Sequence, residues 1–429
     1  MTVPLTIAEV GARGDGIATH DGNRYFVPFA LAGETVEIEP GVRRGEGMAA
    51  TLLRIVTPSP ERQTPPCPHF TVCGGCALQH WLGEPYAAWK SGLIARALSQ
   101  SGVTAPAFEP GLVGLPRERR RADFVLRRQG KRVLAGFHER GSHHVVDVES
   151  CPVITPRLEA LLGSLRTTGS SFLADGGAAD AVVNDTESGL DLLLRPHAKS
   201  EPSLAAREAL VALAETVDLA RLSWGGKGDP ETIVMRRPPM MTFGDASVEL
   251  PPGAFLQVTR QAEQAMRDAV AAWVGDAKRA ADLFAGIGTL SLGQFRRLSL
   301  YESDREAVAA VDEAARRLGG GKAAATRRDL FRNPLAAGDL AVFDAVLLDP
   351  PRAGAAAQVA ELARSTVPRI VYASCDPGSF ARDARTLQDG GYRLEKLMPI
   401  DQFLWSAHVE LIALFTRAPL RSDQRSKRK

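Results

Sequence analysis

The sequence predicts a multidomain α/β protein whose C-terminal part is a doubly wound, Rossmann-like domain. From about residue 251, apolar strand-like runs alternate with Ala-rich helical segments, which is typical of a mostly parallel sheet covered by helices. A glycine-containing turn follows the first of these runs, as in domains that bind nucleotide-like ligands. With 429 residues, of which 45% are hydrophobic, the chain is long enough for two or three domains.

Three domains are expected. Residues 1–57 contain short runs rich in β-branched and aromatic residues between Gly, Asp and Asn turns, which predicts a small all-β domain. Residues 58–250 begin with a proline-rich linker and a cysteine-rich segment. A helix over 85–100 and several strand-like runs follow, which predicts a central α+β domain. Residues 251–429 form the Rossmann-like domain, which begins with a helix over 261–274.

Charge and hydrophobicity favour a cytoplasmic protein. The chain has 52 Lys and Arg against 50 Asp and Glu, so its net charge of +2 indicates no particular partner. No apolar run approaches the ~20 residues that span a bilayer, and the N-terminus does not resemble a signal peptide. Five cysteines are too few for a disulfide framework. We therefore expect a cytoplasmic monomer without membrane association.

Two segments carry a local excess of positive charge. Residues 117–132 have eight basic and two acidic side chains, and residues 417–429 have six basic and one acidic. Such patches suit phosphate contacts with a nucleic acid, but a solvated strand and a disordered tail share the same composition. In the first segment the expected phosphate contacts, some of which would instead pack against carboxylates, are Arg117, Arg119, Arg120 and Arg121.

The segment RAADLFAGIGTLSL, residues 279–292, runs from a strand through Gly286 and Gly288 towards an expected helix. Glycines let the backbone approach a ligand closely, with the helix N-terminus behind it. Glu302 ends the next strand-like run, where a carboxylate can accept hydrogen bonds from both hydroxyls of a ribose. The GxG pattern alone is weak, because many tight turns share it.

Two residues favour S-adenosylmethionine over NAD as the ligand of this turn. A dinucleotide site uses a third glycine, in GxGxxG, to hold a pyrophosphate, and Ser291 occupies that position here. Asp282 lies at the end of the preceding strand. An acidic group there is compatible with S-adenosylmethionine, which has no phosphate and carries a sulfonium.

The run FDAVLLDPPRAGA, residues 343–355, is expected to be a buried strand that ends at Asp349, where open α/β sheets bind ligands. Methyltransferases that modify an exocyclic nitrogen often have an aromatic residue after Asp/Asn-Pro-Pro, and its ring stacks on the base. Arg352 occupies that position here, which argues against nitrogen as the acceptor. A helix-entry turn stiffened by two prolines is the structural alternative.

The run RIVYASC, residues 369–375, places Cys375 at the carboxyl end of the next strand. Pyrimidine C5 is barely nucleophilic, but a thiolate that adds to C6 produces an enolate that attacks an activated methyl group. A base must then take the C5 proton, and Glu410 in the last apolar strand is the expected base. A buried thiol and a rim salt bridge are the structural alternatives for these two residues.

Four blocks follow one another along the chain: DLFAGIG, LDPPRAG, YASCDP and HVELIALFTR. In this order they resemble the RNA uracil-C5 (m5U) methyltransferase family. An N-terminal β domain with a cysteine cluster resembles the branch that modifies 23S rRNA, the RlmD type. The resemblance implies that Cys375 is the nucleophile and Glu410 the proton-abstracting base. It also implies that residues 1–57 are a TRAM domain, an RNA-binding barrel of the OB kind.

The resemblance further implies a set of S-adenosylmethionine contacts. By position in the family's motifs they are Gln257, Phe284, Thr289, Glu302, Asp329 and Asp349. At four positions where asparagine is common in the family, this sequence has another polar residue: Thr259, Thr289, Asp329 and Asp376.

By the same resemblance, four cysteines would hold a [4Fe-4S] cluster: Cys67, Cys73, Cys76 and Cys151. Their spacing, C-x5-C-x2-C with a distant fourth cysteine, allows zinc nearly as well. The family's cluster is structural or RNA-related and takes no part in methyl transfer.

Two alternatives to methylation of 23S rRNA remain: the same chemistry on tRNA, and a non-catalytic RNA-binding or ribosome-assembly factor. Bacterial tRNA-specific members of the family typically lack the β domain and the cluster. A binding factor needs neither Cys375 nor Glu410. A radical iron–sulfur methylase is disfavoured, because its CxxxCxxC triad is absent.

Overall fold

The computed structural model describes residues 2–198, 201–226 and 230–417. The chain forms two compact units. The first unit contains residues 1–93, 113–237 and 401–408, and the second contains 94–112, 238–400 and 409–429. Most of the basic C-terminal segment considered above, residues 418–429, lies outside the described residues.

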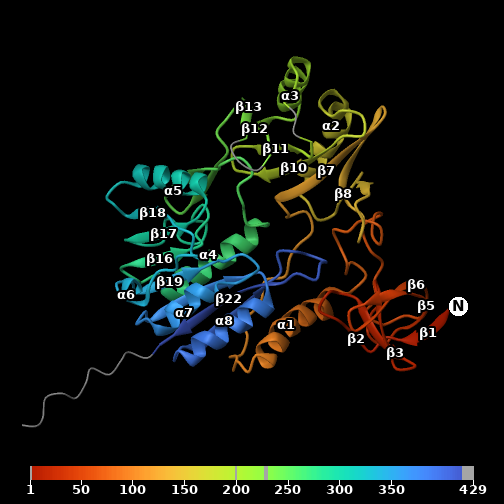
Figure 1. Cartoon of the computed structure of the whole chain (residues 1–429), viewed down its shortest axis with the longest axis horizontal. Helices are drawn as coiled ribbons and strands as arrows, with labels where there is room; N and C mark the ends of the chain where they lie inside the picture. The colour runs from red at the N-terminus through yellow and green to blue at the C-terminus, as the bar shows by residue number, and fades with distance from the viewer. Residues whose placement is uncertain (1, 199–200, 227–229, 418–429) are drawn as a thin grey trace, which may run out of the picture. The chain divides into compact units, whose positions relative to one another are not determined.

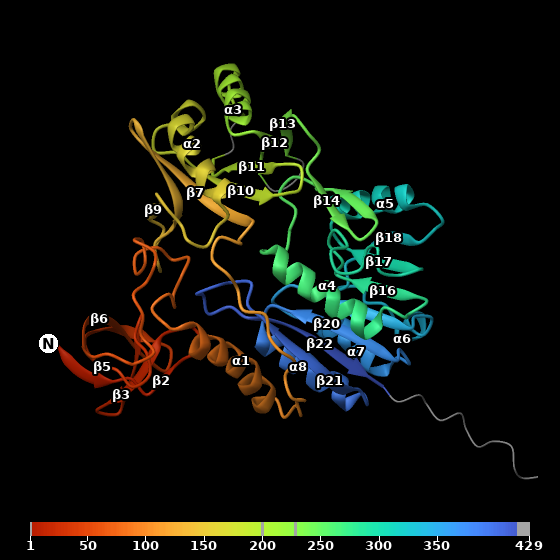
Figure 2. The ribbon, with the colours of Figure 1, turned by 180° about the vertical axis from the view of Figure 1, so that it is seen from behind.

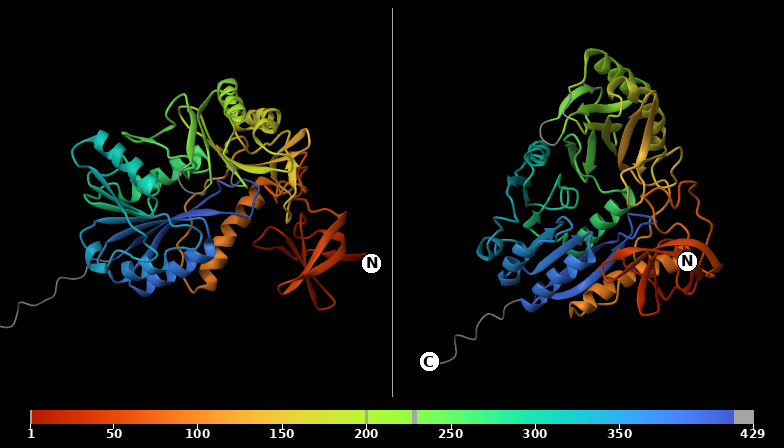
Figure 3. Two further views of the ribbon diagram at one scale, coloured as in Figure 1. Left: turned by 45° about the horizontal axis from the view of Figure 1, so that its top comes forward. Right: turned by 45° about the vertical axis from the view of Figure 1, so that its right-hand side comes forward.

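The first unit begins with a six-stranded sheet, drawn in red in Figure 1. The strand order is β1-β5-β6-β4-β3-β2, and β4 and β6 are the parallel neighbours within it. β1 also contacts β3, and Figure 3 shows the sheet curling on itself. Alternate residues such as Val36 and Ile38 are buried, which is the period expected of a sheet with one covered face. The strands are β1 (Val3–Thr6), β2 (Glu9–Val10), β3 (Gly16–His20), β4 (Asn23–Val27), β5 (Thr35–Arg44) and β6 (Gly47–Thr57).

A second sheet in this unit has seven strands in the order β13-β12-β11-β10-β7-β8-β9. Helices α2 and α3 pack against it and against each other (Figures 1 and 2). Leucines of the helices, such as Leu161 and Leu210, meet sheet leucines such as Leu192 in one core. The elements are β7 (Arg121–Gln129), β8 (Arg132–His138), β9 (Val145–Asp147), α2 (Pro156–Phe172), β10 (Ala178–Asp185), β11 (Leu190–Pro196), α3 (Leu204–Thr216), β12 (Leu219–Trp224) and β13 (Glu231–Met235).

Residues 401–408 return to the first unit late in the sequence. The backbone oxygen of Trp405 accepts hydrogen bonds from Ala77 and Leu78, at 2.8 and 2.9 Å. Lys90, in the N-terminal half of α1 (Gly83–Gln100), forms a buried ion pair with Asp401. These contacts anchor the returning segment beside the cysteine-rich part of the chain.

The second unit is built on a seven-stranded sheet in the order β18-β17-β16-β19-β20-β22-β21. The neighbours from β18 to β20 are parallel, and β22 lies antiparallel between β20 and β21. α4 and α5 lie on one face, and α7 and α8 on the other (Figures 1 and 2). The predicted doubly wound α/β architecture is therefore confirmed. The elements are β14 (Met240–Phe243), β15 (Ala246–Glu249), α4 (Arg260–Val274), β16 (Ala280–Leu283), β17 (Leu298–Glu302), α5 (Arg305–Leu318), β18 (Ala323–Arg327), α6 (Ala337–Leu340), β19 (Ala345–Leu348), α7 (Ala356–Arg364), β20 (Arg369–Ser374), α8 (Pro377–Asp389), β21 (Arg393–Ile400) and β22 (Glu410–Thr416).

One local expectation is wrong: no helix follows the glycine turn. Residues 286–294 form successive turns instead, with short-range bonds such as Ser291 N–H to the oxygen of Gly288 at 3.1 Å. Gly288 and Gly293 both have positive φ, at 76° and 74°. A regular α-helix cannot pass through such residues. The glycine turn therefore has no helix N-terminus behind it.

No helix in the described part of the chain has the length and hydrophobicity needed to cross a membrane.

Candidate functional site

The predicted site residues of the second unit lie where neighbouring strands of its sheet end. Asp282 precedes the last residue of β16, and Glu302 is the last residue of β17. Asp349 follows β19 directly, and Cys375 follows β20. These four strands run parallel, so their carboxyl ends share one edge of the sheet. The topology therefore brings the four side chains to the same edge.

The glycine turn forms an open backbone loop that Glu302 holds. The Gly286 N–H donates to Oε2 of Glu302 at 3.0 Å. A Cβ atom built on Gly286 would meet nothing within 4 Å, whereas one on Gly288 would lie 2.6 Å from Leu292. Phe284 has a φ of 61°, which is strained for a non-glycine residue. The backbone of the turn is therefore closely packed against Leu292 at Gly288, whereas the space beside Gly286 is empty.

The turn is also held by a residue that the sequence did not single out. The buried guanidinium of Arg267, from α4, donates to the backbone oxygens of Thr289 and Leu292, the second at 2.9 Å. An Arg at one helical position gives no local signal of this contact, because its acceptors lie more than 20 residues further along the chain. The predicted contact residue Thr289 is itself 9% exposed.

Two carboxyl groups at this edge have strongly raised pKa values. Burial, followed by the charges of Asp349 and Glu302, raises the pKa of Asp282 to about 7. Desolvation likewise raises the pKa of Asp349 to about 7, although this side chain is only half-buried by surface area. Oδ2 of Asp282 is buried without a partner at hydrogen-bond geometry, although the nearby Ser291 hydroxyl opposes the rise in the pKa of Asp282. A buried, unsatisfied acceptor among carboxylates suits a cationic ligand, so these residues fit S-adenosylmethionine.

The remaining predicted cofactor contacts lie around the same edge. Nε2 of Gln257, which is 3% exposed, donates to Oδ2 of Asp349 at 3.3 Å. The rings of Phe284 and Phe331 are 5.2 Å apart. Oδ1 of Asp329 accepts from the N–H of Phe331 at 3.0 Å, so this exposed carboxylate shapes the turn that carries the second ring.

Cys375 and Glu410 belong to adjacent antiparallel strands. The last paired residues of β20 and β22 are Ser374 and Leu411, and Cys375 and Glu410 are the next residue on each strand. Glu410 is 6% exposed and Cys375 is half-buried. Burial, and then the charges of Glu410 and Asp349, raise the pKa of the Cys375 thiol to about 11. The positive charge of Arg352 opposes this shift.

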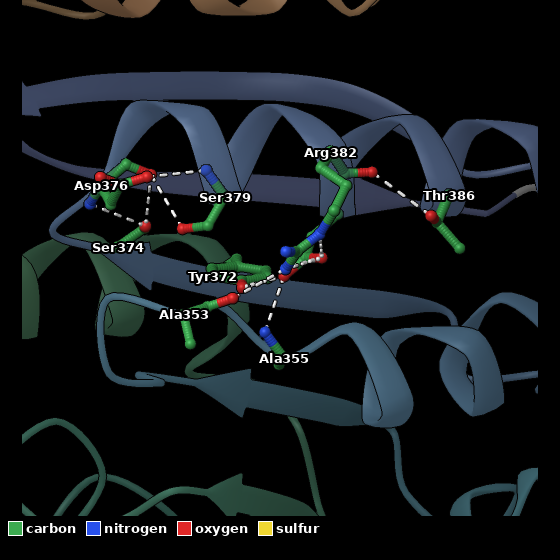
Figure 4. A network of polar contacts seen from close by, with 9 residues as sticks. Ala353, Ala355, Tyr372, Ser374, Asp376, Ser379, Arg382 and Thr386 are labelled. Carbon is green, nitrogen blue, oxygen red and sulfur yellow. Dashed lines mark hydrogen bonds and ion pairs between the residues drawn. The ribbon is translucent and has the colours of Figure 1, made fainter. Parts of the chain in front are cut away.

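Two of the positions that depart from asparagine have a structural role. Oδ1 of Asp376 accepts from the N–H of Ser379 at 2.8 Å and caps α8, as Figure 4 shows. Oγ1 of Thr259 accepts from the N–H of Ala262 at 3.1 Å and caps α4. Thr and Asp, like Asn, are favoured at this position. The substitutions therefore preserve the helix starts on either side of the site.

The other four cysteines belong to the first unit. They form no disulfide, and each is partly buried. Burial, followed by the charges of Cys151, Cys73 and Cys67, raises the pKa of Cys76 to about 12, so the four thiols influence one another. The Gly75 N–H also approaches Sγ of Cys73, at 3.5 Å. A set of four neighbouring thiols suits iron–sulfur or zinc binding. Within the described residues, however, no three such side chains lie in ligand positions for one metal ion.

The arginines of the basic segment 117–132 are largely used within the first unit. Arg120 is 1% exposed, so the expectation that it contacts phosphate from the surface is wrong. Arg119 donates to the oxygen of Arg121 at 2.9 Å and lies over the ring of Phe403. Arg117 pairs with Glu159. Arg119 and Arg120 therefore make contacts within the unit. Arg117, whose side chain is 46% exposed, pairs with its carboxylate at the surface, and its contact with phosphate stays a prediction.

Comparisons with known proteins find similarity to RNA methyltransferases. A family profile described as tRNA (uracil-5-)-methyltransferase matches residues 320–418. An uncharacterised RNA methyltransferase of Brucella suis is 44% identical over 97% of this chain and 98% of its own. The 23S rRNA (uracil(1939)-C(5))-methyltransferase RlmD of Aeromonas salmonicida is 34% identical over 96% of each chain.

One solved structure has the same fold over nearly the full length. It is the tRNA (uracil-54, C5)-methyltransferase of Pyrococcus abyssi in complex with S-adenosyl-L-homocysteine. The TM-score is 0.74, with 21% identity, over 96% of this chain and 99% of that one. At this identity the likeness concerns the fold alone.

Proposed function

Because the chain belongs to the RNA (uracil-5-)-methyltransferase family, we propose that it transfers a methyl group from S-adenosylmethionine to C5 of a uridine in 23S rRNA. The relative named for 23S rRNA is 34% identical over 96% of both chains, whereas the tRNA enzyme of known structure is 21% identical, which favours 23S rRNA over tRNA. We also propose that the protein acts as a monomer in the cytoplasm, alongside its RNA substrate.

One observation carries the proposed chemistry: Cys375 lies at the sheet edge next to Glu410, within electrostatic reach of Asp349. The Cys375 thiolate adds to C6 of the uracil, and the electron pair of the C5–C6 bond moves to C5 as an enolate. C5 then attacks the methyl carbon of the sulfonium, whose carbon–sulfur bond breaks. The C5 proton passes to Glu410, and the Cys375–C6 bond breaks to restore the double bond. The net change replaces hydrogen at C5 with methyl.

The cofactor side of the site follows from the same geometry. Glu302 would receive the ribose hydroxyls beside the open turn at Gly286, and the carboxylates of Asp282 and Asp349 would face the cationic part. S-Adenosylmethionine supplies the electrophilic methyl group. The residues we propose to contact it are Gln257, Phe284, Thr289, Glu302, Asp329 and Asp349.

We propose that the parts outside the Rossmann-like domain bind RNA. The curled sheet of β1–β6, in residues 1–57, would act as a TRAM-type barrel. The expected boundaries, 58–250 for the central domain and 251–429 for the catalytic one, differ from the compact units, in which 94–112 and 238–250 join the second unit and 401–408 the first. The target uracil has to leave its stack to reach Cys375, so a loop with unstacked bases is the expected substrate.

We further propose that the four cysteines of the first unit hold a [4Fe-4S] cluster. Anaerobically purified protein should then contain about four iron and four sulfide per chain, with broad visible absorption that is lost in Cys76→Ser. Stoichiometric zinc without iron would contradict the cluster and leave the methylation proposal untouched.

A methylation assay with two RNAs tests the main proposal. The protein is incubated with unmodified 23S rRNA or tRNA transcripts and S-adenosylmethionine labelled in the methyl group, and the nucleosides are identified by mass spectrometry. We expect 5-methyluridine in 23S rRNA, and none with Cys375→Ala. Modification of tRNA alone would replace the substrate and keep the chemistry. No 5-methyluridine in either RNA would contradict both.

A further inference from the structure

A buried carboxylate outside the proposed catalytic set joins the elements that carry it. Asp383, in the middle of α8, is 1% exposed and lies among apolar residues such as Phe380 and Leu387. A charged group buried in such surroundings is costly unless hydrogen bonds satisfy it. Its partners are therefore informative.

All the partners of Asp383 come from segments next to the site. Its Oδ2 accepts from the backbone N–H of Ala355 and from the hydroxyl of Tyr372, each at 2.7 Å. Its Oδ1 accepts from Nε and Nη2 of Arg382, at 2.9 and 2.8 Å. Nη2 of Arg382 also donates to the oxygen of Ala353 at 2.9 Å. Figure 4 shows the labelled partners Ala353, Ala355, Tyr372 and Arg382 converging from the loop, β20 and α8.

The loop concerned is 349–354, which contains Asp349 and Arg352 and which we call the DPPRAG loop. Gly354 ends it with a φ of 75°, and a Cβ atom there would lie 2.6 Å from Oδ2 of Asp383 and 2.5 Å from Nη2 of Arg382. Only glycine therefore fits both the backbone conformation and the space. The loop rests directly against this carboxylate.

Tyr372 connects the same carboxylate to the proposed nucleophile. It lies on β20, three residues before Cys375, and its ring also contacts that of Phe380 at 5.5 Å. One side chain therefore holds the DPPRAG loop, the strand that ends at Cys375 and the helix that follows it.

We propose that Asp383 is a positioning residue, which sets the DPPRAG loop relative to Cys375 so that Asp349 and Arg352 face the thiol. This proposal rests on the function proposed above. Asp383 accepts hydrogen bonds from Ala355, the residue that follows the loop, and from Tyr372 on the strand, and it acts through them. Its loss is expected to reduce the rate of methyl transfer more than the affinity for S-adenosylmethionine, because Asp349 is one cofactor contact on the loop, whereas Glu302 and the glycine turn lie on other strands.

The test compares Asp383→Asn with a matched control on the same helix, Asp389→Asn, whose carboxylate is exposed and paired with Arg385. Asparagine keeps the size of the side chain but presents an NH₂ group to a site lined with donors. We expect folded Asp383→Asn to have a kcat lowered by about 10- to 100-fold, a misplacement effect. The KM for RNA should stay within about twofold of wild type, and the Kd for S-adenosylmethionine should rise by a smaller factor than kcat falls. All parameters of the control should stay within about twofold of wild type.

A second readout needs no RNA. Asp349 and Arg352 both influence the Cys375 thiol, so a displaced loop should change the pH profile of Cys375 alkylation by iodoacetamide, followed by peptide mass spectrometry. An unchanged profile together with a wild-type kcat, measured below the melting transition, would overturn the proposal. If the wild-type protein methylates no RNA, the proposed function fails, but the alkylation profile of Cys375 in Asp383→Asn still tests the positioning role. A shifted profile supports this role, and an unchanged profile contradicts it.

Discussion

Cys375 and Glu410 are the next residues beyond the Ser374–Leu411 pair, on two adjacent antiparallel strands of the sheet. The insertion of β22 between β20 and β21 produces this relationship, because it turns the start of the last strand towards the carboxyl end of β20. A thiol and a carboxylate that are 35 positions apart in the sequence thus become neighbours. The proposed nucleophile and the proposed base could then act on opposite ends of one C5–C6 bond.

Replacing the base should stop the reaction after methyl transfer. In Glu410→Gln the C5 proton has no acceptor, so elimination of Cys375 from C6 is blocked. We expect a covalent protein–RNA adduct that carries the transferred methyl group, and release of 5-methyluridine lowered by about 100-fold or more. Denaturing electrophoresis with methyl-labelled cofactor measures both. Release of product at the wild-type rate would show that another group takes the proton.

The reactivity of Cys375 should depend on the charges around it. Its thiol pKa is raised to about 11 by burial and by Glu410 and Asp349, so alkylation in the free protein should still be rising above pH 9. Glu410→Gln removes one negative charge and should lower the pKa, which gives faster alkylation at pH 9, by roughly two- to tenfold. Arg352→Gln should have the opposite effect. Peptide mass spectrometry separates Cys375 from the other four cysteines, and equal rates in all three proteins would contradict this electrostatic account.

Asp282 should make the protein less stable as the pH rises. Its pKa in the folded protein is raised from 3.8 to about 7, so the folded state binds more protons than the unfolded state between these values. The free energy of unfolding therefore falls as the pH rises through about 7. The side chain in Asp282→Asn does not titrate. The free energy of unfolding of this variant minus that of wild type should therefore increase by about 1–3 kcal/mol between pH 5 and pH 8.

Chemical denaturation at the two pH values measures this difference, with the exposed Asp268→Asn on α4 as the control. The same Asp282 variant should bind S-adenosylmethionine more weakly, because the buried acceptor is altered. A difference that shrinks as the pH rises would contradict the raised pKa.

Glu302 should contribute directly to cofactor affinity. Glu302→Gln keeps an acceptor for the Gly286 N–H but loses the charge that strengthens bonds from ribose hydroxyls. We expect the Kd for S-adenosylmethionine to rise by about tenfold or more, as for a hydrogen bond to a charged group. Isothermal titration calorimetry measures it, and Glu313→Gln on the exposed face of α5 is the matched control. An unchanged Kd would exclude the ribose role.

The sheet and most of its site could be predicted because their signals are local. Apolar runs that are buried on both faces mark β16, β19, β20 and β22, and a polar residue at the end of each run marks the edge. Contacts between distant segments were not predictable. The helix expected after Gly288 is absent because Gly288 and Gly293 have positive φ, and the contact that holds this turn comes from Arg267 on an earlier helix.

Two further residues illustrate why composition misleads. Arg120 belongs to a run of arginines that suggests a surface, yet its side chain is buried at the start of a core strand. Asp383 looks like an ordinary polar position of an amphipathic helix, and only the fold brings it to Ala355 and Tyr372. In both cases tertiary packing decides the environment, and the pattern of neighbouring residues carries no trace of it.

Covalent trapping tests the central claim most directly. The protein is incubated with S-adenosylmethionine and a 23S rRNA fragment in which uridines are replaced by 5-fluorouridine, whose fluorine cannot leave as a proton. We predict a stable adduct that contains the transferred methyl group, with RNA attached at Cys375 in the mass-spectrometric peptide map. The comparison uses an RNA sequence that the protein methylates when it contains ordinary uridine. If its 5-fluorouridine form gives no adduct, or if Cys375→Ala gives as much adduct as wild type, nucleophilic attack by Cys375 is contradicted.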